Sequence, residues 1–338
     1  MKRIPSLDGL RAISISLVCV GHLTRIKMVP SFFSYYTLTG VQIFFVISGY
    51  LITTILLNEH RQRSTIDLRQ FYTRRAYRIL PAAAVYMLFA LTVYRHELRW
   101  YDIAAMLLYL VNFDAACPWM VGHLWSLGVE EQFYFLWPSV LKHWYRQRIA
   151  ILLGTIIFAP MFSTVCYYFK IPGGGFGMFP SVANTLAFGC LLAILSPRIP
   201  TISGWAASAM LLAVIFIPTF DANTRTRTLF DLFVLSPILQ CSIAGLVLHV
   251  IRSPYRVLNF APVMWLGRIS YSLYLWQQPF FYAQVRYPAY RLLYGVALAC
   301  LSYYLVEQPI LRLRQIRARR RNSKEAPLSS AVELREVS

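Results

Sequence analysis

The first apolar stretch of the chain reads LRAISISLVCVGHL, from Leu10 to Leu23, and it contains two ionisable side chains, Arg11 and His22. On a helix that rises about 1.5 Å per residue, these two residues lie roughly 16 Å apart. That distance is about half of the ~30 Å hydrocarbon thickness of a bilayer. If Arg11 marks one membrane face, His22 lies near the middle or in the far half, where an ionisable side chain indicates function. A histidine that only packs between helices is the open alternative.

The composition indicates which solvent surrounds the chain. Of its 338 residues, 57% are hydrophobic and 14% are charged, and the mean hydropathy is +0.51. A soluble globular chain averages about 25% charged residues. Long apolar runs recur and two-residue alternation does not, so the sequence predicts an all-α integral membrane protein.

The charge is strongly basic, with 33 Lys and Arg against 14 Asp and Glu, a net charge of +19. Much of the excess lies in two clusters, Arg61 to Arg78 and Arg312 to Lys324. Nucleic-acid binding would account for a basic patch, but the positive-inside rule and contact with anionic membrane lipid account for it better. The six cysteines are scattered without metal-ligand spacing, so we expect no metal site and no disulfide framework.

The apolar runs predict about ten transmembrane helices with both termini in the cytoplasm. The stretch 103–113 is too short to cross the bilayer, and we expect it at the outer interface. This arrangement places the arginine-rich loops on the cytoplasmic side. Residues 316–338 are basic and then polar, which predicts a disordered cytoplasmic tail. The predicted spans are 10–24, 36–57, 79–95, 125–141, 149–168, 180–195, 201–219, 229–251, 263–283 and 290–311.

An arginine cluster stands at the start of the third predicted span, in the run RRAYRILP from Arg74 to Pro81. Arg75 and Arg78 are three residues apart and share a helix face. Two guanidinium groups on one face suit a phosphorylated ligand. A plain positive-inside anchor is the alternative.

A second polar motif, HLWSLGVEEQFY from His123 to Tyr134, falls in an apolar span. Glu130 and Glu131 point about 100° apart on a helix, so one of them is expected to face a site with a histidine or an arginine. Ser126, four residues before Glu130, shares its face. A structural ion pair with an arginine is the alternative.

Two further motifs lie near the end of the chain. YSLYLWQQP, from Tyr271 to Pro279, places two amides, Gln277 and Gln278, inside a span, where hydrogen bonding between helices is the simpler explanation. Glu307 follows near the end of the last span, where pairing and catalysis are equally open roles.

Together these motifs resemble one family, the membrane-bound acyltransferase-3 family. The resemblance covers roughly residues 4 to 311, which makes 1–315 an acyltransferase-3 transmembrane domain. Several motifs in the same order over that length are far more specific than any one of them. The matching stretches are SLDGLRAI (6–13) with Gly21-His22, GVQIFFVISGYLI (40–52), 75–81, 123–134, 271–279 and Glu307.

The resemblance implies a multi-pass enzyme of the bacterial inner membrane that moves an acyl group, commonly acetyl, to a carbohydrate hydroxyl. Members modify O-antigen lipopolysaccharide, exopolysaccharides, Nod factors and macrolides. It also implies essential roles for Arg11 and His22, and it maps the family's paired arginines to Arg75 and Arg78 and its membrane carboxylate to Glu130. Members often carry a histidine where this chain has Gln277, so no catalytic role is assigned there.

The mechanism we expect from charge placement uses cytoplasmic acyl-CoA, most simply acetyl-CoA, as donor, without a metal. Arg75 and Arg78, with help from Arg74, would bind its phosphates, and Arg11 would assist at the inner mouth. His22 would act as general base on the acceptor hydroxyl or as transient acyl carrier. Glu130 would orient or stabilise His22.

A multi-span transporter or flippase for a lipid-linked or small sugar is the competing class, since carriers also bury charges among interrupted helices. The acceptor, a carbohydrate or glycolipid, stays open. No fused periplasmic hydrolase-like domain is evident, so we expect the chain to complete transfer alone or with a separate periplasmic partner.

Overall fold

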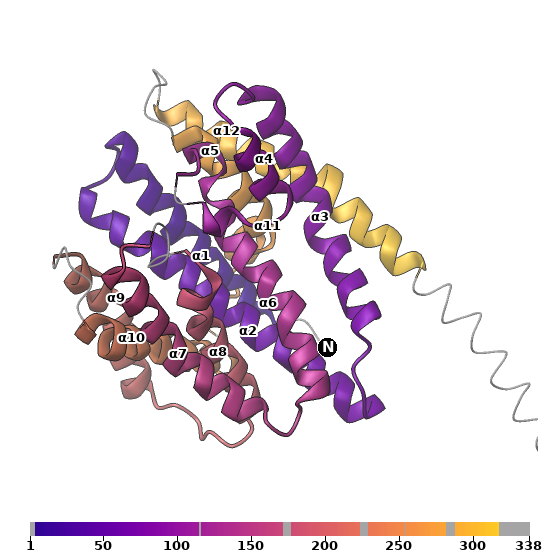
Figure 1. Ribbon diagram of the computed structural model, residues 1–338, viewed down its shortest axis with the longest axis vertical. Helices are drawn as coiled ribbons and strands as arrows, with labels where there is room; N and C mark the ends of the chain where they lie inside the picture. Colours follow the sequence, from indigo (N-terminus) through magenta and orange to yellow (C-terminus); the bar gives the residue numbers. More distant parts are fainter. Residues whose placement is uncertain are drawn as a thin grey trace, which may run out of the picture.

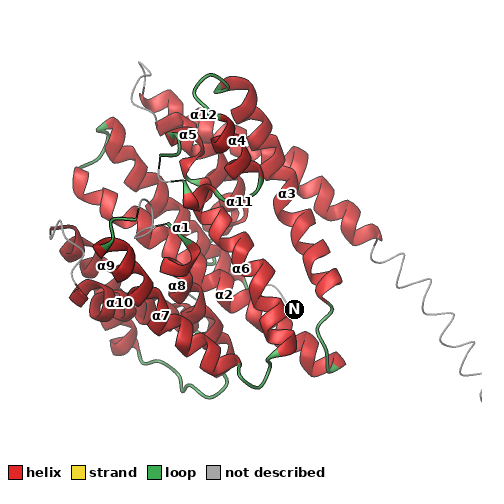
Figure 2. Cartoon of the chain, in the orientation of Figure 1, coloured by secondary structure: helices red, strands yellow, loops and turns green. Residues whose placement is uncertain are grey.

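The computed structural model describes residues 4–114, 116–171, 177–223, 229–253, 255–281 and 288–317. These residues form helices and connecting loops and contain no β-strand (Figure 2). The predicted all-α class is therefore confirmed for the described part of the chain. The helix at the C-terminal end runs to residue 317, so most of the predicted tail, 316–338, lies outside the described residues.

Each predicted span contains a helix. The long helices are α1 (Pro5–Leu23), α2 (Tyr36–Arg63), α3 (Leu68–Val93), α6 (Leu124–His143), α7 (Arg148–Tyr168), α8 (Phe179–Leu195), α9 (Gly204–Asn223), α10 (Ser236–Arg252), α11 (Ala261–Gln277) and α12 (Pro288–Leu301). Shorter elements are η1 (Thr24–Ile26), η2 (Ser31–Tyr35), α4 (Trp100–Leu107), η3 (Val111–Phe113), α5 (Trp119–Gly122) and η5 (Gln278–Phe281), with two π-helical turns, η4 (Asp231–Leu235) and η6 (Ser302–Glu307).

Helix α3 begins eleven residues earlier than the third predicted span, because Asp67 caps it. The Asp67 carboxylate accepts a hydrogen bond from the Gln70 backbone N–H at 2.9 Å, which satisfies one of the free donors of the first turn. Arg75 and Arg78 therefore lie within a continuous helix rather than in a loop.

Among the described residues, five helical segments are long and apolar enough to cross a bilayer, which indicates a multi-pass membrane protein. They are Pro5–Ile26, Ser31–Arg63, Leu68–Val93, Arg148–Tyr168 and Asp231–Arg252. Ten crossings and cytoplasmic termini stay predictions. Helix α4 has eight residues, far fewer than the roughly 20 that a crossing needs.

Helices α1 and α2 lie at the centre of the bundle. Helix α1 packs against α2 and α11, and α2 packs against α8. In Figure 1, α7 to α10 gather on one side of the molecule and α3 lies on the other. Gly49 of α2 and Gly189 of α8 face each other's backbones so closely that a Cβ at either would overlap a carbonyl oxygen of the other helix. Ser6, Asp8 and Ser14 of α1 are buried within this bundle.

Candidate active site

Three arginines from three helices line a cavity of about 420 Å³, here called the entrance cavity. Arg11 comes from α1, Arg78 from α3 and Arg268 from α11. Asp8 and Glu307 also line it. Glu307 lies in the π-helical turn η6, and such turns are frequent at functional sites.

A narrower cavity of about 80 Å³, the central cavity, shares Arg11 and Arg78 with the entrance cavity. Arg75 lines the central cavity as well, which confirms that Arg75 and Arg78 lie on one helix face. Ser126 and Glu130 of α6 line it too, as their spacing predicts. The two cavities are adjacent because Arg11 and Arg78 line both of them, and together they extend from the arginines toward α6.

The arginines of these cavities are not neutralised by a direct ion pair. Arg11, Arg75, Arg78 and Arg268 have no carboxylate within ion-pair distance among the described residues. Arg75 instead lies over the Tyr134 ring, 4.7 Å from its centre. These four guanidinium groups, which have no ion-pair partner among the described residues and line two adjacent cavities, could hold a multiply charged anion such as a phosphate group.

Arg74 behaves differently from its neighbour Arg75. Its guanidinium pairs with Glu59 at 2.9 Å and donates to Gln70 at 2.8 Å, and it lines neither arginine cavity. The structure therefore does not bring Arg74 together with the other predicted donor-binding residues. Its role is to join α3 to α2.

Glu130 is half-buried in the lining of the central cavity and has no hydrogen bond to His22. Its carboxylate accepts a hydrogen bond from Ser48 at 2.6 Å, and the Ser48 hydroxyl accepts one from Tyr134 at 3.3 Å. We expected Glu130 to orient His22, but its carboxylate bonds to Ser48 instead. Glu130 places negative charge among the arginines instead.

The partner of His22 is Gln277, the position that carried no role in the sequence. The His22 Nδ1 and the Gln277 Oε1 lie 2.7 Å apart. Trp119 and Phe281 complete the surroundings, with ring centres 5.2 Å and 6.1 Å from the imidazole. His22 is half-buried, and Gln277 is only 1% exposed.

A chain of hydrogen bonds determines which nitrogen of His22 carries the proton. The Gln278 amide donates to the Trp119 carbonyl at 2.8 Å, so its oxygen faces the Gln277 amide nitrogen at 3.4 Å. The Gln277 oxygen is then left to accept from Nδ1–H of His22. Nε2 of His22 is unprotonated in this tautomer and can act as a base or a nucleophile.

His22 lines neither the entrance cavity nor the central cavity. Tyr274 lies at the boundary of the central cavity. Its hydroxyl donates a hydrogen bond to the His123 carbonyl at 3.0 Å and lies 2.6 Å from the Ser126 Oγ.

Sequence reasoning missed Arg268 and the role of Gln277. Arg268 carried a usable signal, because a charged residue inside the predicted span 263–283 is itself a functional hypothesis. The role of Gln277 had no such signal, because its contact with His22 joins residues 255 positions apart.

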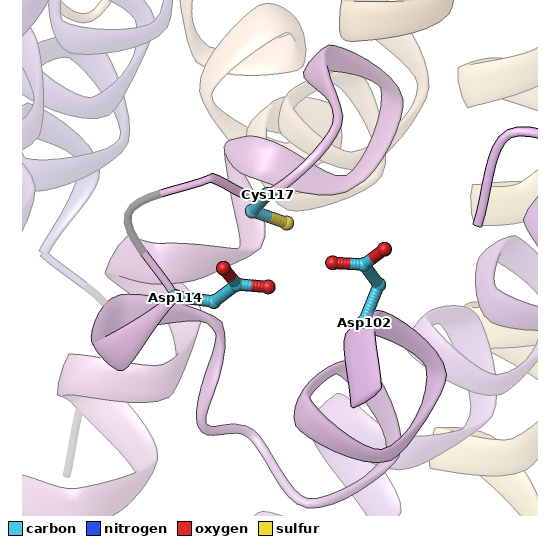
Figure 3. Close-up of side chains that lie close together, drawn as sticks. All are labelled: Asp102, Asp114 and Cys117. Carbon is cyan, nitrogen blue, oxygen red and sulfur yellow. The ribbon is translucent and has the colours of Figure 1, made fainter. Parts of the chain in front are cut away.

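One group of metal-type ligands lies among the described residues. Figure 3 shows Asp102 of α4 and Asp114 and Cys117 of the segment after η3 turned toward one another, with ligand atoms within 4.8 Å. The Arg99 guanidinium lies against this group, 2.6 Å from Asp102 and 3.5 Å from Asp114, and it also donates to the Ala116 carbonyl at 2.9 Å. This ion cluster holds the segment that leads to Trp119, beside His22.

Comparison with known proteins matches residues 4–307 to a family model described as an acyltransferase domain. The peptidoglycan O-acetyltransferase OatA of Listeria monocytogenes is 28% identical over 317 residues, which cover 82% of this chain and 49% of that protein. The O-acetyltransferase OatA of Staphylococcus aureus is 28% identical (91% of this chain, 57% of that protein). The putative peptidoglycan O-acetyltransferase YrhL of Bacillus subtilis is 29% identical (91% and 55%).

The chain thus spans about half the length of these relatives. No solved structure matches it. The family model covers nearly all of the helical bundle, including the arginine cavities, His22 and Glu307. The chain therefore belongs to the acyltransferase-3 family of membrane acyltransferases.

Proposed function

We propose that this protein transfers an acyl group, most simply acetyl, from acyl-CoA to a hydroxyl group of a cell-surface or secreted carbohydrate. The observation that supports the proposal is the set of four arginines around two adjacent cavities, none of which has an ion-pair partner in the part of the chain that the structure describes. Coenzyme A is a polyanion with a long flexible arm, and such an anion matches both the charge and the depth of these cavities.

The donor binds with its phosphates at Arg11, Arg78 and Arg268 in the entrance cavity. Arg75 and the central cavity receive the arm that ends in the thioester. Arg11 and His22 lie on the same helix about 16 Å apart, which is the distance that the arm has to span. The entrance cavity then faces the cytoplasm, where acyl-CoA is made, and the protein spans the bacterial cytoplasmic membrane.

The chemistry follows from the tautomer of His22. Nε2 removes the proton of the acceptor hydroxyl, the hydroxyl oxygen bonds to the thioester carbon, and the carbon–sulfur bond breaks. The imidazolium then returns the proton to the coenzyme A thiolate. In the two-step alternative, Nε2 itself takes the acyl group and passes it to the acceptor.

The carbohydrate acceptor is supported by the relatives, two of which are named as acting on peptidoglycan. The family match also favours an enzyme over a transporter or flippase.

Thermal unfolding of the purified protein with and without acetyl-CoA tests donor binding. We expect acetyl-CoA to raise the Tm of the wild type and of Arg74→Gln, whose guanidinium is paired outside the cavities. The increase should be lost in Arg78→Gln and reduced in Arg75→Gln. Equal stabilisation of all four proteins, or of none, would contradict the proposed donor site. A transporter of simple sugars would show none.

Acyl transfer tests the chemistry separately. His22→Ala should lose transfer by about 100- to 10,000-fold, the usual contribution of a general base, while acetyl-CoA still raises its Tm. An active, correctly inserted His22→Ala protein would refute the role of the imidazole.

A further inference from the structure

A third cavity, of about 350 Å³, lies on the side of the central cavity away from the entrance. The three cavities follow one another along α2: Leu38 lines the third and Leu51 lines the entrance, about 20 Å apart along the helix. Phe45 lines both the third and the central cavity. Trp125 of the third cavity directly precedes Ser126 of the central one.

The described residues that line this third cavity differ in charge from those of the arginine cavities. They include no lysine or arginine, and Asp231 is the single charged side chain among them. Asp231 is 6% exposed and lies in the π-helical turn η4, the second such turn that borders a cavity. The other polar lining residues carry amides and hydroxyls and include Thr39, Gln42, Asn184, Thr185, Ser236 and Gln240.

Two of these amides keep unused hydrogen-bonding capacity. Gln240 is 2% exposed; its Nε2 donates to Thr185 at 2.9 Å and to Ser236 at 3.1 Å, but its Oε1 is buried without a partner. Turning the amide over would leave the nitrogen unpartnered instead. The Oε1 of Gln42, on the opposite helix α2, is also buried without a partner. Buried polar groups are normally satisfied, and each unpaired one costs about 1–3 kcal/mol.

We infer that this third cavity binds a neutral sugar unit of the acceptor, an assignment that rests on the proposed function. The unpaired amide oxygens of Gln42 and Gln240 and the hydroxyls of the lining are suited to the hydroxyl groups of a saccharide, and the Trp125 ring supplies an apolar surface for its C–H face. The described residues that line the cavity offer no cation for the phosphates of the donor. The cavity volume lies within the usual range for small-ligand sites, about 300–1,000 Å³.

Saccharide binding to the full-length protein tests the inference. The probes are a tetramer of N-acetylglucosamine, which is neutral, and a tetramer of galacturonic acid, which carries a carboxylate on each ring. We expect the neutral tetramer to raise the Tm of the wild type and the anionic one to leave it unchanged, because the described residues that line the cavity include no cation to pair with its carboxylates.

The variants Gln42→Met and Gln240→Met keep the side-chain length and remove the amide. Each should bind the neutral tetramer roughly 2- to 12-fold more weakly, the equivalent of one hydrogen bond. Gln42→Met is the safer variant, because the bond of Gln240 to Thr185 also joins α10 to α8. Gln132→Met is the matched control, since Gln132 bonds Asn112 at 2.9 Å and lines none of the three cavities.

Stabilisation by acetyl-CoA is measured in the same samples and separates the two proposals. If acetyl-CoA stabilises every variant while only the two cavity variants lose saccharide binding, both proposals stand. If the neutral tetramer fails to stabilise the wild type, or binds Gln42→Met and Gln240→Met as tightly as the wild type, the saccharide site is wrong. Failure of acetyl-CoA to stabilise the wild type would instead overturn the donor site.

Discussion

Replacing Gln277 with leucine should slow acyl transfer without weakening donor binding. The change removes the 2.7 Å hydrogen bond that keeps the proton on Nδ1 of His22, and it does so at a side chain that is 1% exposed, where water cannot substitute. A buried hydrogen bond of this kind is worth about 1–2 kcal/mol. At about 1.4 kcal/mol for each factor of ten, kcat should fall roughly 5- to 30-fold. The KM for acetyl-CoA should not change, because the arginine cavities are untouched.

The assay is release of coenzyme A thiol by membranes that contain the protein, supplied with acetyl-CoA and native surface glycan. Gln277→Glu is the matched control, because a carboxylate of the same length still accepts from Nδ1–H. It should therefore retain far more activity than Gln277→Leu, and the Tm of both proteins shows whether they are folded. A wild-type kcat for folded Gln277→Leu, or equal loss in both variants, would refute the argument from the tautomer.

Three further predictions concern stability. Tyr274→Phe loses its hydrogen bond to the His123 carbonyl and should lower the free energy of unfolding by about 1 kcal/mol, measured by denaturant unfolding. Gly189→Val should destabilise the protein by about 2 kcal/mol or more through overpacking, whereas Gly154→Val, where nothing lies within 4 Å of a Cβ, should not; thermal unfolding distinguishes them. The hydrogen bond from Arg99 lowers the pKa of Asp102, so this carboxylate stabilises the fold at neutral pH and its contribution is lost as the pH falls below about 4. Asp102→Asn should therefore have a lower Tm at pH 7 and a smaller further loss on acidification, which unfolding at the two pH values measures.

The local sequence pattern was sufficient to predict the features that depend on a single helix. Long apolar runs predicted the helices, because a lipid-facing segment must satisfy its own backbone hydrogen bonds. The spacing of Arg75 and Arg78, and that of Ser126 and Glu130, correctly predicted shared faces, since residues three and four apart lie together on a helix. Spacing did not distinguish Arg74 from Arg75, because pairing with Glu59 depends on how α2 lies beside α3.

The sequence by itself thus determined the class of protein, its helices, and the arginine faces that resemble an acyltransferase. Only the tertiary structure decided which groups meet: Gln277 rather than Glu130 at His22, Arg268 beside Arg78, and Gln42 across a cavity from Gln240. The physical reason is that helical periodicity specifies which side of a helix a residue occupies, whereas its partner is set by packing between helices that are far apart in the chain. Glycines such as Gly49 and Gly189 permit that packing, but the close approach of α2 and α8 at these glycines can be recognised only when the positions of both helices are known.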